Sequence, residues 1–218
     1  MLRTSFPVDI PSQSVSCDIQ YGFIRRPTHE NTPVEQAMYE ICAHRYADIS
    51  CDSFGAALLN NCKYGYRVKN GVIDLALLRS PKYPDHEADM GIQEFTYTFL
   101  PHAGNLIHSS VMMEAALLNR PVMILPEFRS GRQFAIGINS PRVTLEVIKK
   151  AEKEDCLIIR AVETHGMPAV AELSLNGLTG AVETDLTEWK DLKFYQAVSG
   201  KITLEFTPFE IKTLKLKK

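Results

Sequence analysis

Alternation of apolar and polar residues with a period of two is the feature that most constrains the fold of this chain. The alternation recurs in short segments, and turn-forming residues separate many of them at intervals of roughly 8–12 residues, which is typical of β-sandwiches. Only residues 109–120 show clear helical spacing, so helices to cross between parallel strands are lacking. We therefore predict an all-β protein, an antiparallel β-sandwich with one or two short helices. The expected strands span residues 15–23, 39–47, 54–59, 64–68, 72–78, 92–100, 122–125, 143–148, 157–162, 169–175, 201–206 and 209–216.

Local signals refine this pattern. Asn70 and Gly71 lie between two expected strands, and because both residues tolerate positive φ they predict a hairpin. The expected helix begins at Ser109 or Ser110, either of which can cap its first turn. The charged run KKAEKED at 149–155 is interpreted as a solvated turn.

Composition excludes several classes of protein. The 218 residues are 45% hydrophobic and 23% charged, which argues against intrinsic disorder. The formal net charge of -2 gives no reason to expect binding to nucleic acid or to an anionic membrane. No stretch approaches the roughly 20 apolar residues that span a bilayer. Five cysteines without a CxxC pair, and a start without an apolar signal region, predict a reducing, cytoplasmic location.

Two segments carry candidate binding residues. Residues 25–32 (RRPTHENT) bring Arg25 and His29 into one loop, where they could bind an anion or sugar hydroxyls. The simpler interpretation, which spacing alone favours, is a polar loop that hydrogen-bonds its own backbone. Residues 84–91 (PDHEADMG) hold three carboxylates and an imidazole between two strong strand patterns.

Asp85 and Asp89 of this second segment are candidates for carboxylate chemistry. A retaining glycosidase needs two carboxyl groups about 5–5.5 Å apart, and a hairpin tip could supply them. The commoner explanation is an acidic, solvated hairpin. We expect no metal site within the chain, because Cys42 and His44 share a strand face but no second ligand pair follows. We also find no G-x-S-x-G motif and no phosphate-binding glycine loop.

Five segments in order resemble motifs of the family 38 glycoside hydrolases, the α-mannosidases. The first resembles the family's G-x-x-x-R-P-T-H-x-N-T, the second F-E-V-x-A-H-x-W-A-D-x-S, and the third A-L-L-N-D-x-K-Y-G-Y. The resemblance runs from about residue 2 to residue 213 and is closest to the cytosolic and bacterial branch. The segments are YGFIRRPTHENT at 21–32, YEICAHRYAD at 39–48, ALLNNCKYGY at 57–66, the stretch from LLRSP at 77–81 to LPH at 100–102, and RAVETHG at 160–166.

The resemblance implies a C-terminal β-sandwich region only. In the family, an upstream α/β barrel and helix bundle carry the zinc ligands and the aspartate nucleophile, and none of that is in this sequence. The implied activity of the whole enzyme is hydrolysis of terminal α-mannosidic bonds with retention. The chain then packs against the barrel and lends residues 84–91 and 25–32 to the rim of the mannoside site. Met90 stands where other members often carry Arg or Gln, so a charged contact from that position is not expected.

Two questions stay open at this level. The chain is expected either as one β region over 1–218, or as a larger sandwich over 1–150 with a smaller β unit over 151–218. The alternative function is a freestanding carbohydrate-binding or interaction module without catalysis, although the sequence offers one Trp, Trp189, as a sugar platform. Since Phe6, Val8 and Ile10 begin a strand pattern at the very start, we expect a missing upstream partner and self-association of the isolated chain.

Overall fold

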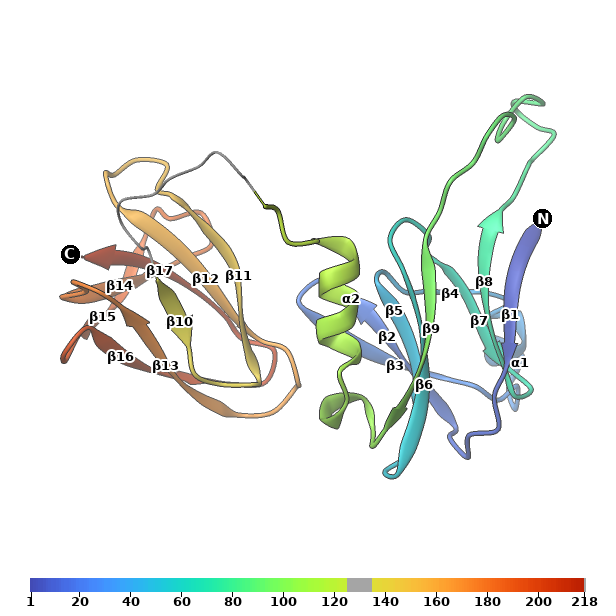
Figure 1. Cartoon of the computed structure of the whole chain (residues 1–218), viewed down its shortest axis with the longest axis horizontal. Helices are drawn as coiled ribbons and strands as arrows, with labels where there is room; N and C mark the ends of the chain where they lie inside the picture. Colours follow the sequence, from blue (N-terminus) through green and yellow to red (C-terminus); the bar gives the residue numbers. More distant parts are fainter. Residues whose placement is uncertain (125–134, 218) are drawn as a thin grey trace. The chain divides into compact units, whose positions relative to one another are not determined.

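The computed structural model describes residues 1–124 and 135–217 (Figure 1). The chain divides into two compact units, Met1–Ile124 and Leu125–Lys218. Strands make up 49% of the residues and helices 8%, and all the strand pairs are antiparallel among the described residues. The all-β sandwich class predicted from the alternation is therefore confirmed.

The first unit is a sandwich of two sheets. Its larger sheet has the order β3-β2-β5-β6-β9, and its smaller sheet has the order β1-β8-β7-β4. Apolar side chains such as Val15, Leu58 and Tyr66 fill the space between the two sheets. The strands are β1 (Leu2–Pro7), β2 (Ser14–Ile19), β3 (Gly22–Pro27), β4 (Ile41–Cys42), β5 (Tyr46–Ser50), β6 (Phe54–Asn60), β7 (Gly65–Lys69), β8 (Val72–Leu78) and β9 (Tyr97–Ala103).

Helices cover the outer face of the larger sheet. Helix α2 (Val111–Asn119) and the 3-10 turn η1 (Leu106–His108) pack on Tyr46, Ala57 and Leu59, on the side away from the sandwich core (Figure 1). The helix predicted at 109–120 is confirmed. A short helix that the sequence did not predict, α1 (Pro33–Ala37), follows β3.

The second unit is a smaller sandwich of a three-stranded sheet, β10-β13-β16, and a five-stranded sheet, β11-β12-β17-β14-β15. Leucine, isoleucine, valine and alanine side chains from both sheets form its core. Because β11 pairs along its length with β12, it belongs to this unit, and the division falls near residue 124 instead of the expected residue 150. The strands are β10 (Ile136–Ile138), β11 (Val143–Lys150), β12 (Leu157–Glu163), β13 (Ala169–Leu175), β14 (Gly180–Thr184), β15 (Asp191–Gln196), β16 (Lys201–Phe206) and β17 (Ile211–Lys217).

The prediction of a single strand over residues 39–47 is wrong. The chain leaves the smaller sheet at β4 and enters the larger sheet at β5, so the alternation continues across a change of sheet. The connection is held by Asp18, because its backbone carbonyl accepts from His44 N at 3.0 Å. Its carboxylate accepts from the backbone N–H and the guanidinium of Arg45 at 2.8–2.9 Å.

Other expected boundaries also shift for identifiable reasons. The strand expected at 92–100 is observed as β9, which runs through Pro101. Proline is tolerated there because β9 is the last strand of its sheet and its other side needs no donor. The strand expected at 15–23 is a hairpin that turns at Tyr21, which has a φ of 60°. Residues 122–124 are not in a strand, and residue 125 lies outside the described residues.

A buried ion pair depends on the absence of a side chain at Gly55. Nε2 of His102 on β9 lies 2.6 Å from Oδ2 of Asp48 on β5, and Ser50 Oγ donates to the other oxygen of Asp48 at 2.6 Å. Gly55 of β6 lies between these strands and pairs with both Ser50 and His102. A Cβ at Gly55 would meet Ser50 Cβ and would lie 2.5 Å from His102 Cε1.

Replacing Gly55 by alanine is therefore expected to displace the His102 ring and to lower the free energy of unfolding by about 1–3 kcal/mol, the range for overpacking a core. The measurement is denaturant unfolding of the full chain followed by far-UV circular dichroism. Gly65→Ala is the matched control, because a Cβ there meets the Glu40 carboxylate at 3.2 Å and that flexible side chain can move away. Equal stability of the Gly55→Ala variant and the wild type would refute this packing argument.

Candidate functional site

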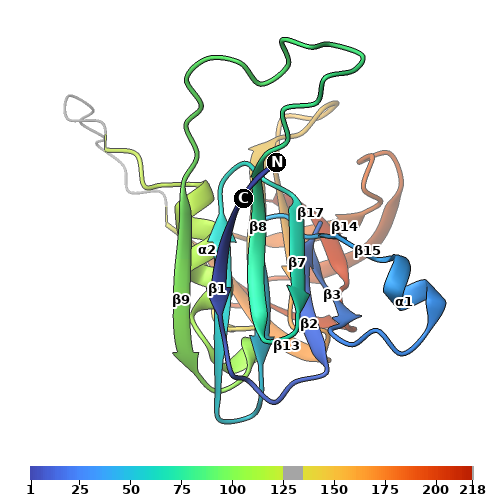
Figure 2. The same cartoon turned by 90° about the vertical axis from the view of Figure 1, so that its right-hand side faces the viewer.

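The loop at 79–96 carries three of the five candidate site residues, Asp85, Asp89 and Met90. It joins β8 to β9 and extends past the ends of the neighbouring strands (Figures 1 and 2). Loops longer than about 12–15 residues without secondary structure are uncommon in compact domains and are often functional. This loop is therefore the first candidate for a functional surface in the first unit.

The side chains of this loop divide into two chemical groups. Large apolar side chains point into solvent: Tyr83 is 88% exposed, Met90 70% and Ile92 94%. The two candidate carboxylates organise the loop itself, since Asp85 Oδ1 accepts from Glu87 N at 2.9 Å. Asp89 Oδ2 accepts from Ser80 N at 2.8 Å, across the base of the loop. The loop presents an apolar surface on an acidic frame.

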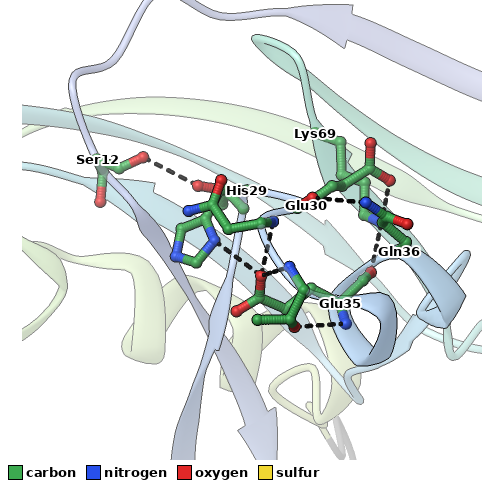
Figure 3. A network of polar contacts seen from close by, with 9 residues as sticks. Ser12, His29, Glu30, Glu35, Gln36 and Lys69 are labelled. Carbon is green, nitrogen blue, oxygen red and sulfur yellow. Dashed lines mark hydrogen bonds and ion pairs between the residues drawn. The ribbon is translucent and has the colours of Figure 1, made fainter.

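His29 has a local structural role. Its Nδ1 lies 3.2 Å from Glu35 Oε2, and the same oxygen accepts from the backbone N–H groups of Asn31 and Thr32 at 2.8 and 2.9 Å (Figure 3). Thr32 Oγ1 in turn accepts from Glu35 N at 3.3 Å, which completes a capping box at the start of α1. His29 thus takes part in a local hydrogen-bond network, as the simpler interpretation of residues 25–32 expects, but the acceptor, Glu35, lies just beyond the segment.

The expectation that Arg25 and His29 share one loop is wrong, because Arg25 lies within β3 and on a different surface. The strand register forms a row across the larger sheet that runs from Arg25 through Ser16, Asp48 and Ala57 to Leu100. The loop at 79–96 joins the larger sheet at Tyr97, the first residue of β9, three residues before Leu100. His29 lies at the other end of the sheet, because it follows the last residue of β3. The structure therefore brings Asp85, Asp89 and Met90 into one loop, and separates them from Arg25 and His29.

A polar pocket adjoins Arg25 on the helix-covered face of the larger sheet. Its volume is about 190 Å³, and β2, β3, the end of β5 and η1 contribute to its wall. No sequence pattern predicted this pocket, because its residues come from segments between 12 and 107 that only strand pairing brings together. The wall of the pocket includes Ser14, Ser16, Phe23, Arg25, Asp52 and Asn105.

The ion pair of Asp48 and His102 lies next to this pocket, since Ser50, which donates to Asp48, is part of the wall. The His102 side chain is 5% exposed and that of Asp48 is fully buried. The hydrogen bond from His102 to Asp48 raises the pKa of His102, and burial of the ring opposes this shift. Because Nδ1 also lies 3.3 Å from the Ala103 carbonyl oxygen, both ring nitrogens have acceptors, as an imidazolium requires.

Within residues 1–124 and 135–217, no three His, Cys, Asp or Glu side chains lie close enough together to hold a metal ion. In the same residues no helix is long and apolar enough to cross a membrane.

Glu163 is a buried carboxylate in one of the family-like motifs, and its role is structural. It is fully buried at the end of β12, and its two oxygens accept from four backbone N–H groups. The donors are those of His165, Gly166, Met167 and Phe209, at 2.8–3.2 Å. The segment RAVETHG at 160–166 thus stabilises two turns of the second unit.

The chain folds into two β-sandwiches, and they carry the five sequence motifs in the order in which the family 38 glycoside hydrolases have them. Residues 1–87 match the family described as Glycosyl hydrolases family 38 C-terminal domain. Residues 142–214 match the family described as Glycosyl hydrolases family 38 C-terminal beta sandwich domain. The chain belongs to glycosyl hydrolase family 38, of which it is the C-terminal region, so the resemblance is confirmed.

Relatives match over almost the whole chain. Alpha-mannosidase 2C1 of Mus musculus is 40% identical over 223 residues, covering 99% of this chain and 22% of the relative. Alpha-mannosidase G of Dictyostelium discoideum is 35% identical over 235 residues, covering 99% of this chain and 21% of the relative. A crystal structure of a family 38 glycosyl hydrolase from Enterococcus faecalis shares the fold, with a TM-score of 0.79 and 17% identity over 99% of this chain and 26% of that one. The chain spans about a fifth of the length of the curated relatives.

The raised pKa of His102 predicts a specific pH dependence of stability. A histidine whose pKa is higher in the folded than in the unfolded state stabilises the fold fully below the unfolded value of about 6.5. That contribution is lost as the pH rises through the folded-state pKa. The difference in unfolding free energy between the wild type and His102→Gln is therefore expected to be largest below pH 6.5 and to shrink above it.

The measurement is urea unfolding of both proteins across this pH range, with an NMR titration of the His102 ring as a direct readout. Asp48→Asn is the matched control, since it removes the charge that holds the proton. A His102 midpoint that is unchanged by Asp48→Asn would contradict the assigned cause.

The role of Glu163 predicts that Glu163→Gln destabilises the second unit by about 1–3 kcal/mol, because the amide nitrogen replaces one acceptor and faces backbone donors. Thermal unfolding followed by Trp189 fluorescence reports on this unit. Glu172→Gln is the control, since that carboxylate pairs with Lys201 at the surface and such pairs contribute little. Equal shifts for both variants would argue against the role assigned to Glu163.

Proposed function

We propose that this chain serves as the C-terminal β region of a retaining α-mannosidase, in which it packs on a catalytic domain and lends the loop at 79–96 to the rim of the mannoside site. The observation that carries the proposal is the match of the whole chain to a fifth of longer relatives named α-mannosidases. Hydrolysis of terminal α-mannosidic bonds, zinc binding by the catalytic domain, and a cytoplasmic location belong to this proposal.

The chemistry of the loop supports a docking role in preference to a catalytic one. Tyr83, Met90 and Ile92 expose apolar surface that water solvates poorly, and a partner surface would cover it. Asp85 and Asp89 each hold a backbone N–H of the loop, so they fix the shape in which these side chains are presented. Met90 offers a flexible apolar contact and no charge to a substrate.

The isolated chain is therefore expected to leave an aryl α-mannoside unhydrolysed, with or without added zinc. Addition of a separately expressed catalytic region of the same family is expected to yield hydrolysis. Ile92→Asp is expected to lower that activity at least tenfold, because docking then buries an unpaired charge. Val34→Asp is the matched control, since Val34 is 71% exposed on α1 of the same unit.

Two results would overturn the proposal. One is hydrolysis by the isolated chain that is lost on Asp85→Asn or Asp89→Asn, which would make the acidic loop a catalytic site. The other is a catalytic region that reaches the same activity with and without this chain.

A further inference from the structure

We propose that the polar pocket beside Arg25 binds a small neutral polyhydroxy ligand, of the size of one sugar ring. The pocket lies within the first unit, on the face of the larger sheet that η1 partly covers. It is distinct from the loop at 79–96 and does not depend on the docking role proposed for that loop.

Arg25 is the first observation. Its register partner Ser16 is also the partner of Asp48, so Arg25 shares the helix-covered face with these residues. Among the described residues no hydrogen bond or ion pair holds its guanidinium, whereas Arg3 and Arg45 are each paired with a carboxylate. Arg25 therefore offers its donors to a ligand in a pocket where hydroxyl groups form much of the wall.

Asp52 supplies hydrogen-bond acceptors to the same pocket. One of its oxygens accepts from Asn105 Nδ2 at 3.3 Å, and the other has lone pairs available for a donor. Asn105 itself is held in place, because its Oδ1 lies 2.9 Å from Nδ1 of His108. The pocket thus combines a fixed acceptor with the donors of Arg25.

A ligand hydroxyl group can bind to either side chain, because it can donate a hydrogen bond to the Asp52 carboxylate or accept one from the Arg25 guanidinium. An anion would meet the charge of Asp52, and a cation would meet that of Arg25. Ser50 adds an acceptor, since its proton is already directed to Asp48.

The size and the wall of the pocket narrow the ligand further. A volume of about 190 Å³ is below the roughly 300–1,000 Å³ of sites for drug-sized ligands, which favours one ring over an oligosaccharide. Phe23 of β3 adds an apolar residue to the otherwise largely polar wall. The sequence motif that contains Arg25 thus contributes to a site separate from the helix cap formed around His29.

The test is a titration of the 218-residue chain with methyl α-D-mannopyranoside, monitored by the backbone amide signals of Ser16 and Asn105 in NMR spectra. Saturable shifts at these amides are expected. Arg25→Ala and Asp52→Asn are each expected to weaken binding about tenfold, the effect of losing one charge-assisted hydrogen bond. Arg67→Ala is the matched control, an exposed arginine on β7 outside the pocket, and it is expected to leave the affinity unchanged.

Inorganic phosphate and glycine are titrated in parallel. Saturable binding of phosphate or glycine through Arg25, without binding of the mannoside, would overturn the proposal in favour of a charged ligand. Absence of mannoside binding would also overturn it, as would an affinity that is equally reduced by Arg67→Ala or unchanged by both pocket variants.

Discussion

The central strands of the larger sheet of the first unit are buried on both faces, and the rest of this unit is organised around that constraint. The sandwich core covers one face, while η1 and α2 cover much of the other. Its central strands β5 and β6 are buried over almost their full length. Every buried polar group in this sheet therefore needs a partner within the protein, because an unpaired buried group costs about 1–3 kcal/mol.

Three polar clusters meet this requirement. Asp18 binds the backbone and guanidinium of Arg45, and Asp48 binds His102. Asn60, which is 1% exposed, donates to the His44 carbonyl at 2.9 Å and accepts from Cys62 N at 2.9 Å. These contacts join strands to the connections between them, so residues that a motif search singles out act largely by holding the fold together. The family motif around Asn60 has this structural explanation.

The surfaces that are available for function lie where the constraint is relaxed. The loop at 79–96 leaves the sheets and exposes apolar side chains that its own carboxylates hold in position. The pocket beside Arg25 lies under the edge of η1, where the cover of the sheet is incomplete and polar side chains replace apolar ones. One surface suits a protein partner and the other suits a small polar ligand.

The sequence by itself determined the fold class, the α2 helix, the Asn70-Gly71 hairpin and the family, because alternation, turn residues and ordered motifs are local properties of the chain. Only the tertiary structure decided that residues 39–47 change sheets and that Pro101 lies within an edge strand, since both depend on which strands become neighbours. The same reason explains the candidate sites. The sequence identified Arg25 and His29 as one segment. Strand pairing places Arg25 at the pocket, whereas His29 lies beyond the end of β3 and hydrogen-bonds Glu35 of α1.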